Sequence, residues 1–351
     1  MTSPTLHCRA QTHQLRPGAA TYLLGLLLSL VPPCLCRPLS AQSPAAPPAP
    51  QLVLFDTDIG DDIDDVLALG LALSSPELKI VGITASWGDT TLRARLLDRL
   101  LSQSGHADVP VAIGPVKHHA GEGVFSQAAW ASRQPARDYP DAVDFLLSTV
   151  HQHSDVVTLI AVAPLTTIAA AFDRDPATFR HLHRIILMGG SVHRGYGDLG
   201  YTPGHGPDAE YNIAMDPEAA RKVFTSGVPF FVMPLDSTQI PLDEAKRRLL
   251  FTASTPLTDA LTLLYQQWSR ATELITPTMF DAVAVAFAIN PAVCPVEPLR
   301  LVVDVQGFTR EQPGLPSAQV CLRSNTDAFF DLFMRRLLGP GQPRSLPPSH
   351  P

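Results

Sequence analysis

Residues 56–65 read DTDIGDDIDD, which places six carboxylates within ten residues. The apolar run Leu52–Phe55 before this stretch is typical of a buried strand, and the apolar run Val66–Leu73 after it is typical of a buried helix. We therefore expect a strand-to-helix turn at the carboxyl end of the first strand of a parallel sheet, where open α/β sheets bind ligands. Unit charges about 6 Å apart repel by roughly 3 kcal/mol at an effective dielectric of about 20, so these acids need a counter-charge. Carboxylate oxygens favour Ca²⁺ or Mg²⁺ over zinc.

Other interpretations of the acidic stretch fit less well. A solvated turn that caps the helix explains the pair Asp64–Asp65 but leaves Asp56 and Asp58, on the strand side, without a role. An EF-hand loop fails on spacing, because Gly60 comes one place too early. A phosphatase that forms an aspartyl phosphate would have Thr two places after the second acid, where this chain has Gly60. A carboxylate-bound metal ion remains the interpretation that uses both groups of acids.

Composition and charge narrow the class of protein. The chain has 351 residues, of which 45% are hydrophobic, and this is enough to bury one large α/β core. The net charge of −7 argues against a nucleic-acid partner, because nucleic-acid-binding proteins present a basic face. No apolar run is long enough to form a stable membrane span.

The two ends of the chain are predicted to lie outside the fold. The first 41 residues are typical of a secretory signal peptide, with Arg9 and Arg16 ahead of the apolar stretch Tyr22–Val31, which is too short to cross a bilayer. The protein is therefore expected to be exported, to a periplasm or to the outside of the cell. The predicted divisions are a signal peptide (1–41), a Pro/Ala-rich linker (42–50), a folded domain (51–338) and a flexible Pro-rich tail (339–351).

The stretch DTDIGDDIDD, followed by VLAL, resembles the amino-terminal signature of the calcium-dependent nucleoside hydrolases, the inosine/uridine-preferring family. Four further segments resemble this family in the expected order: Ala163–Ile168, Ile185–Gly190, Glu210–Asn212 and Met279–Ala284. The resemblance covers residues 52–338. It implies a single α/β domain with a Rossmann-type core, a mostly parallel open sheet with helices on both faces. It also implies that residues 51–338 hydrolyse the N-glycosidic bond of ribonucleosides to free base and ribose.

The resemblance assigns the acidic residues to a calcium site. The implied ligands are Asp58, Asp65, Asp281 and the backbone oxygen of Thr166. Asp58 is also expected to activate a calcium-bound water, which attacks C1′ of the ribose. Asp64–Asp65 is matched with the family's acidic pair because it directly precedes the apolar helix. Asp61–Asp62 is the competing alignment, since this turn is longer than the usual one.

The resemblance also implies a set of substrate contacts: Asp64, Asp89, Met188, Glu210, Tyr211, Asn212 and Phe280. Glu210 and Asn212 are expected to grip the ribose, with Asn212 taking part in catalysis, and Tyr211 to help form the pocket. Asp89 stands where the family usually has Asn. An equally good interpretation makes it the N-cap of the helix that follows.

One position departs from the family in a way that affects the chemistry. Phe280 stands where the family often has a His that is proposed to protonate the leaving base. Either His193 or His205, on the long loop Ser191–Ala209, takes over this role, or no acid operates and the enzyme prefers bases that leave easily. In the second case Phe280 or Trp268 would pack on the base.

A second function from another class fits the same residues. An exported, calcium-dependent ribose- or nucleoside-binding protein with reduced or lost catalysis would keep these contacts and would also account for Phe280. The resemblance suggests a homodimer or homotetramer, and the preferred base is left open. With the signal peptide removed, Cys294 and Cys321 remain, and they either form a disulfide or stay as buried thiols.

Overall fold

The computed structural model describes residues 49–118, 123–201 and 205–339. The predicted signal peptide, most of the linker and the tail from residue 340 lie outside the described residues. Within the described ranges, no helix combines the length and the apolar character needed to cross a membrane.

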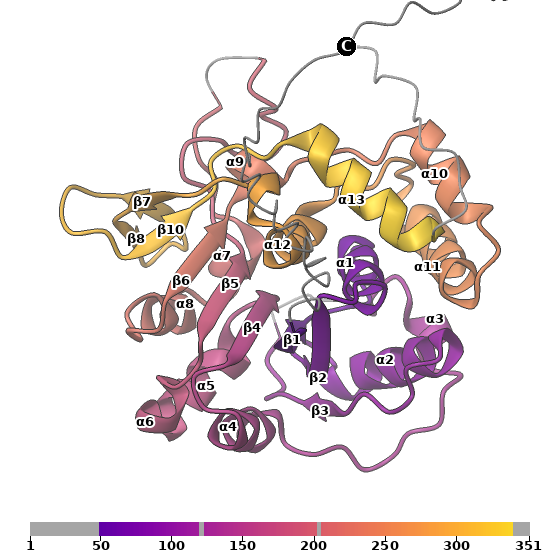
Figure 1. The fold of residues 1–351 in the computed structure, drawn as a ribbon, viewed down its shortest axis with the longest axis horizontal. Helices are drawn as coiled ribbons and strands as arrows, with labels where there is room; N and C mark the ends of the chain where they lie inside the picture. Colours follow the sequence, from indigo (N-terminus) through magenta and orange to yellow (C-terminus); the bar gives the residue numbers. More distant parts are fainter. Residues whose placement is uncertain (1–48, 119–122, 202–204, 340–351) are drawn as a thin grey trace, which may run out of the picture. The chain divides into compact units, whose positions relative to one another are not determined.

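An eight-stranded sheet organises the fold (Figure 1). In spatial order its strands are β3 (Val111–Ile113), β2 (Leu78–Ala85), β1 (Gln51–Thr57), β4 (Val157–Val162), β5 (Arg184–Met188), β6 (Phe230–Met233), β10 (Ala318–Val320) and β7 (Glu297–Leu299). All neighbouring strands are parallel except β10 and β7, which pair antiparallel at one edge. The strand order reverses between β1 and β4, so the carboxyl ends of these two strands form the crevice at which such sheets bind ligands.

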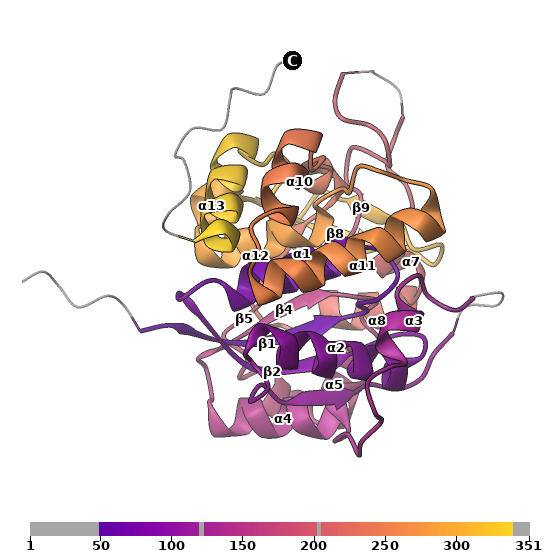
Figure 2. The same cartoon turned by 90° about the vertical axis from the view of Figure 1, so that its right-hand side faces the viewer.

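Helices cover both faces of this sheet, and Figures 1 and 2 show α1, α12 and α13 on one side and α4 and α5 on the other. The first layer contains α1 (Asp64–Leu73), α2 (Thr90–Ser104), α3 (Ala128–Ala131), α9 (Leu235–Thr238), α10 (Glu244–Phe251), α11 (Pro256–Thr272), α12 (Phe280–Ile289) and α13 (Thr326–Leu338). The second layer contains α4 (Ala142–Gln152), α5 (Thr166–Arg174), α6 (Pro176–Phe179), α7 (Tyr211–Ala214) and α8 (Pro217–Phe224). This arrangement confirms the predicted fold class.

The strand sequences explain why both faces are covered. In β1, Val53 and Phe55 enter the core under the first helix layer, whereas Leu54 enters the core under the second. Successive strand residues point to opposite faces, so a continuous apolar run of this kind has two buried faces.

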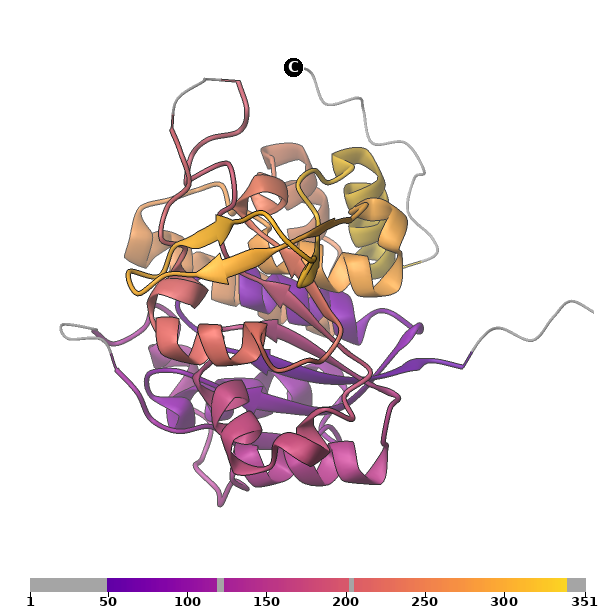
Figure 3. The ribbon, with the colours of Figure 1, turned by 90° about the vertical axis from the view of Figure 1, so that its left-hand side faces the viewer.

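Two smaller features complete the fold. A hairpin of β8 (Leu301–Val303) and β9 (Thr309–Glu311) packs on α8 and appears as a pair of yellow strands in Figure 3. The mixed pattern of residues 242–270 predicts helical structure, and the structure forms two helices there. The chain breaks between α10 and α11, where Thr255 caps the second helix and Pro256 occupies its first turn.

Cys294 and Cys321 form a disulfide with a Cα–Cα distance of 5.7 Å, which settles the alternative that the sequence leaves open. Both residues are fully buried. The bond joins the short helix η1 (Pro291–Val293), which follows α12, to the end of β10. It therefore ties the helix that begins beside Asp281 to the sheet. Disulfides persist in oxidising compartments, which is where an export signal would lead the chain.

Candidate active site

A pocket lies at the carboxyl ends of the central strands. Asp58 follows β1, Val162 ends β4 and Met188 ends β5, and all three residues line this pocket. From the first helix layer, the starts of α1 and α12 contribute Asp64 and Asp281 to the same lining. The predicted strand-to-helix turn is therefore one wall of a pocket at the topological switch point of the sheet.

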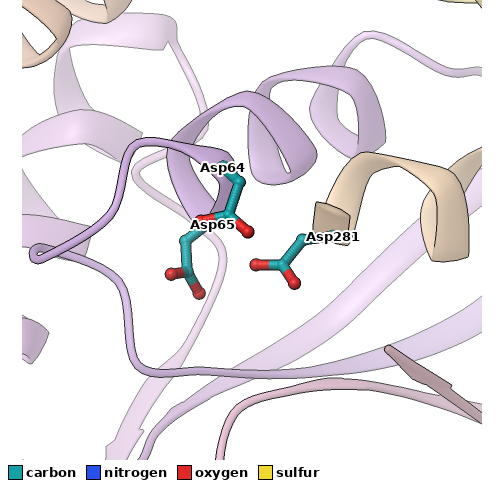
Figure 4. A group of neighbouring side chains, drawn as sticks. All are labelled: Asp64, Asp65 and Asp281. Carbon is teal, nitrogen blue, oxygen red and sulfur yellow. The ribbon is translucent and has the colours of Figure 1, made fainter. Parts of the chain in front are cut away.

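Asp64, Asp65 and Asp281 form the innermost group of acids, which we call the carboxylate cluster. One carboxylate oxygen from each residue lies within 4.8 Å of the others, and all three residues are buried. Figure 4 shows the side chains pointing toward a shared space from the first turns of α1 and α12. Helix N-termini carry partial positive charge, which offsets only part of the repulsion among three acids. The arrangement could hold a metal ion.

The competing acidic pair is placed differently. Asp61 and Asp62 lie in the turn before α1 and are exposed, although both line the outer part of the pocket. They do not join the carboxylate cluster. The structure thus brings Asp64–Asp65, and not Asp61–Asp62, beside Asp281.

The backbone of the acidic turn is held in place by a buried cation. The Arg93 guanidinium, on α2, donates hydrogen bonds to the backbone oxygens of Asp58, Ile59 and Trp87. Its carbon lies 5.0 Å from the centre of the Phe125 ring. Arg93 therefore fixes the turn after β1 against the turn after β2, while the Asp58 side chain stays on the pocket.

The tight turn also depends on a glycine. Gly60 has φ of +130°, and a Cβ there would lie 2.7 Å from the Phe125 ring. Both the backbone conformation and the lack of space favour glycine at this position. The acidic turn is thus shaped by packing as well as by its charges.

Burial raises the pKa of every acid at the centre of the pocket. The pKa of Asp58 rises to about 7, although the nearby Arg93 charge opposes the shift. Burial, followed by repulsion from neighbouring carboxylates, raises the pKa values of the three cluster residues well above the ordinary range. Charged carboxylates are therefore unfavourable here unless a cation joins them.

This electrostatic strain predicts a pH-dependent stability in the metal-free protein. Burial raises the pKa of Glu210 from 4.5 to about 7, so between these values the folded chain binds more protons than the unfolded chain. The free energy of unfolding should therefore fall as the pH rises through this window, by about 3 kcal/mol for Glu210 alone. Thermal unfolding in chelator should give a lower Tm at about pH 8 than at about pH 5, and Ca²⁺ should raise Tm most at the higher pH. A Tm in chelator that increases from the lower to the higher pH would contradict these pKa directions.

The predicted ribose-binding residues Glu210 and Asn212 line the same pocket. Glu210 is the N-cap of α7, and its carboxylate accepts hydrogen bonds from the backbone N–H groups of Gly190, Asn212 and Ile213. The Asn212 side-chain amide donates to the Met188 backbone oxygen at 3.1 Å. Glu210 and Asn212 are both buried, so these hydrogen bonds hold their side chains in fixed orientations at the pocket.

The remaining predicted contacts divide into two groups. Tyr211 and Phe280 line the pocket. Asp89 does not: it is exposed, and its carboxylate accepts a hydrogen bond from the Leu92 backbone N–H as the N-cap of α2. The N-cap interpretation of Asp89 therefore describes its position.

Thr166 is not part of the pocket lining. It is the first residue of α5, and its hydroxyl donates a hydrogen bond to Asp216 at 2.6 Å. Val162, the last residue of β4 and four places before Thr166, lines the pocket.

Neither histidine proposed as an acid reaches the pocket lining. The His193 Nε2 atom lies 2.9 Å from a carboxylate oxygen of Glu311, on β9. The His205 Nε2 atom lies 2.9 Å from a carboxylate oxygen of Asp208. Tyr196, from the same long loop, lines the pocket instead. Apart from the length of the loop, no sequence pattern indicates a functional role for this residue. Trp268 is both buried in the core and part of the pocket wall.

Comparisons with known proteins bear directly on this site. A profile of the inosine-uridine preferring nucleoside hydrolases matches residues 53–331. The chain belongs to this family. Nucleoside hydrolases also appear among the solved structures most like it. The plant nucleoside hydrolase PpNRh1 has a TM-score of 0.71 at 24% identity, covering 83% of this chain and 100% of that one. The purine-preferring ribonucleoside hydrolase from Gardnerella vaginalis has a TM-score of 0.67 at 25% identity, and the match covers 82% of this chain and 98% of that one.

Curated sequences include nucleoside hydrolases of a stated specificity. The pyrimidine-specific ribonucleoside hydrolase RihA of Citrobacter koseri is 37% identical over 212 residues, which cover 56% of this chain and 64% of that protein. This match spans less than two thirds of the relative. RihA of an Escherichia coli O7:K1 strain is 28% identical over 313 residues, covering 81% of this chain and 97% of that protein.

Proposed function

We propose that this protein hydrolyses the N-glycosidic bond of ribonucleosides, releasing free base and ribose. The observation that carries the proposal is one pocket that combines two groups of polar side chains. The carboxylate cluster and Asp58 make up the first group, and Glu210 with Asn212 makes up the second. Membership of the nucleoside hydrolase family supports the same activity.

The cofactor that fits the carboxylate cluster is Ca²⁺. Three buried carboxylates with raised pKa values need a cation, and all the donor atoms are hard oxygens, which exclude a preference for softer metals. Asp64, Asp65 and Asp281 would hold the ion, with Asp58 and the Val162 segment lining the same space. When bound, the ion would bind ribose hydroxyl oxygens and lower the pKa of the attacking water.

The chain's own residues account for the remaining steps. Asp58 is proposed as the base, because its carboxylate lines the pocket together with the carboxylate cluster, where it could accept a proton from the attacking water. Glu210 and Asn212 would accept and donate hydrogen bonds to the ribose hydroxyls, which fixes C1′ relative to Asp58. The apolar side of the pocket, made by Phe280, Trp268 and Leu274, would receive the base.

The test is an assay of free ribose from a panel of nucleosides, including inosine, guanosine, uridine and cytidine, in phosphate-free buffer. We expect stoichiometric ribose and base from at least one of them. Relatives include both pyrimidine-specific and purine-preferring proteins, so comparing the rates across the panel also identifies the preferred base.

The alternative is a calcium-dependent nucleoside-binding protein without catalysis, favoured by Phe280 at a position where an acid is expected. Binding of the same nucleosides measured by calorimetry, with no ribose released over many hours, would support that alternative. It would also overturn the proposal of a hydrolase.

A further inference from the structure

Glycosidic cleavage leaves an electron pair on the departing base, and something must stabilise it. Phe280, directly before Asp281, has no proton to offer. His193 and His205 interact with Glu311 and Asp208 and lie outside the pocket lining. A donor on the base side of the pocket must therefore come from another residue.

Tyr196 lies beside Phe280 at this end of the pocket. The two rings meet edge to face, with centroids 6.3 Å apart and an interplanar angle of 82°. The Tyr196 side chain lines the pocket, and the residue is 43% exposed, so the position is open to a ligand. Aromatic pairs of this geometry form a stable apolar wall with one polar atom.

The loop backbone around Tyr196 is fixed by hydrogen bonds. The Tyr196 N–H donates to Asp208 at 2.8 Å, and the Gly197 N–H donates to the Gln239 side chain at 2.7 Å. Gln239 in turn donates to the Gly195 oxygen at 3.0 Å. The ring is therefore presented to the pocket by a braced segment, which is what a substrate contact requires.

The hydroxyl of Tyr196 is arranged to donate. Its oxygen accepts a hydrogen bond from the Tyr211 backbone N–H at 3.1 Å, and this leaves the phenolic proton for another partner. Burial, followed by the nearby charges of Glu210 and Asp64, raises the pKa of the Tyr196 hydroxyl well above its ordinary value. The phenol thus stays protonated throughout the physiological range, and it holds its proton too tightly to give it up fully.

We propose that Tyr196 is a catalytic residue that donates a hydrogen bond to the departing base, while its ring and Phe280 pack against that base. The inference rests on the proposed hydrolase function. As the C1′–N bond breaks, its electron pair moves to the base, where the Tyr196 hydroxyl stabilises the developing negative charge. Water adds its oxygen to C1′ and loses a proton to Asp58. The base takes its proton from solvent, and the phenol keeps its own.

The test compares wild type and Tyr196→Phe on inosine, on uridine and on 4-nitrophenyl β-ribofuranoside, whose leaving group is a stable anion. We expect kcat on the better nucleoside to fall by about 10²-fold, the effect of losing one donor to a developing anion. We expect the rate on the nitrophenyl riboside to change by less than about threefold, since that leaving group needs no donor. Tyr139→Phe is the matched control, because its hydroxyl donates to Asp98 away from the pocket lining. Thermal unfolding confirms that each variant is folded.

Unchanged nucleoside hydrolysis in Tyr196→Phe would overturn the inference and leave the proposed function standing. An equal loss on nucleoside and nitrophenyl riboside would also overturn it, because it would place Tyr196 on the ribose and not on the base. Wild-type protein that hydrolyses neither substrate would overturn the proposed function and the inference together.

Discussion

The Asp281→Asn variant is expected to lose calcium binding and activity together. Asp281 contributes one of three carboxylates whose oxygens lie within 4.8 Å of one another, so the neutral amide removes about a third of the cluster's negative charge. A catalytic cation contributes several kcal/mol to transition-state stabilisation, so kcat should fall by about 10³-fold or more. Asp65→Asn should behave in the same way, although its carboxylate also accepts a hydrogen bond from Thr57.

Calorimetric calcium titration, together with kcat, checks this prediction. Asp61→Asn provides the matched control, because Asp61 belongs to the same acidic stretch but is exposed and lies outside the carboxylate cluster. It should bind calcium within a few-fold of wild type. If Asp61→Asn lost the metal while Asp281→Asn kept it, the assignment of the acidic pair would be wrong.

Asp58→Asn should separate catalysis from folding. A positioned general base contributes about 10²- to 10⁴-fold to the rate, and an amide cannot accept the proton, so kcat should fall by that factor. The backbone at this position should stay in place, because Arg93 binds the Asp58 carbonyl and not its side chain. Circular dichroism and Tm should therefore resemble those of wild type.

The measurement is kcat on the best nucleoside of the panel, with calcium saturating for each protein. Asp304→Asn serves as a control for the loss of a carboxylate, since Asp304 caps the β8–β9 turn, away from the pocket lining. Retention of more than about a tenth of wild-type kcat in Asp58→Asn would remove Asp58 from the role of base.

The fold follows from features that the sequence states clearly. The apolar runs on either side of the acidic stretch are too long and too uniform for exposed elements, and they form the buried strand β1 and the buried helix α1. The apolar run that forms α1 also predicts the position of the acidic pair. Carboxylates directly before such a run lie at the first turn of the helix, as Asp64 and Asp65 do. The comparisons confirm both the fold class and the family.

Local contacts between distant segments could not be read in the same way. The pattern at the end of β4 indicates a turn, but it does not indicate that Val162, the last residue of the strand, lines the pocket. The role of Thr166 as a backbone ligand stays a prediction. Tyr196 sits in a long loop without periodicity, and its position depends on hydrogen bonds to Asp208 and Gln239. Arg93 appears in the sequence as one more basic residue of an amphipathic helix. Its buried contact with the acidic turn exists only in the folded chain.

The central claim is that this protein hydrolyses ribonucleosides and that it needs Ca²⁺ bound at the carboxylate cluster to do so. The most direct test follows ribose release from the preferred nucleoside by one sample of wild-type protein, first as purified, then with excess chelator, and then with Ca²⁺ returned in excess. We expect activity to fall by about 10³-fold or more in chelator and to recover when Ca²⁺ is added. Undiminished ribose release in a chelated sample that is shown to be metal-free would contradict the account.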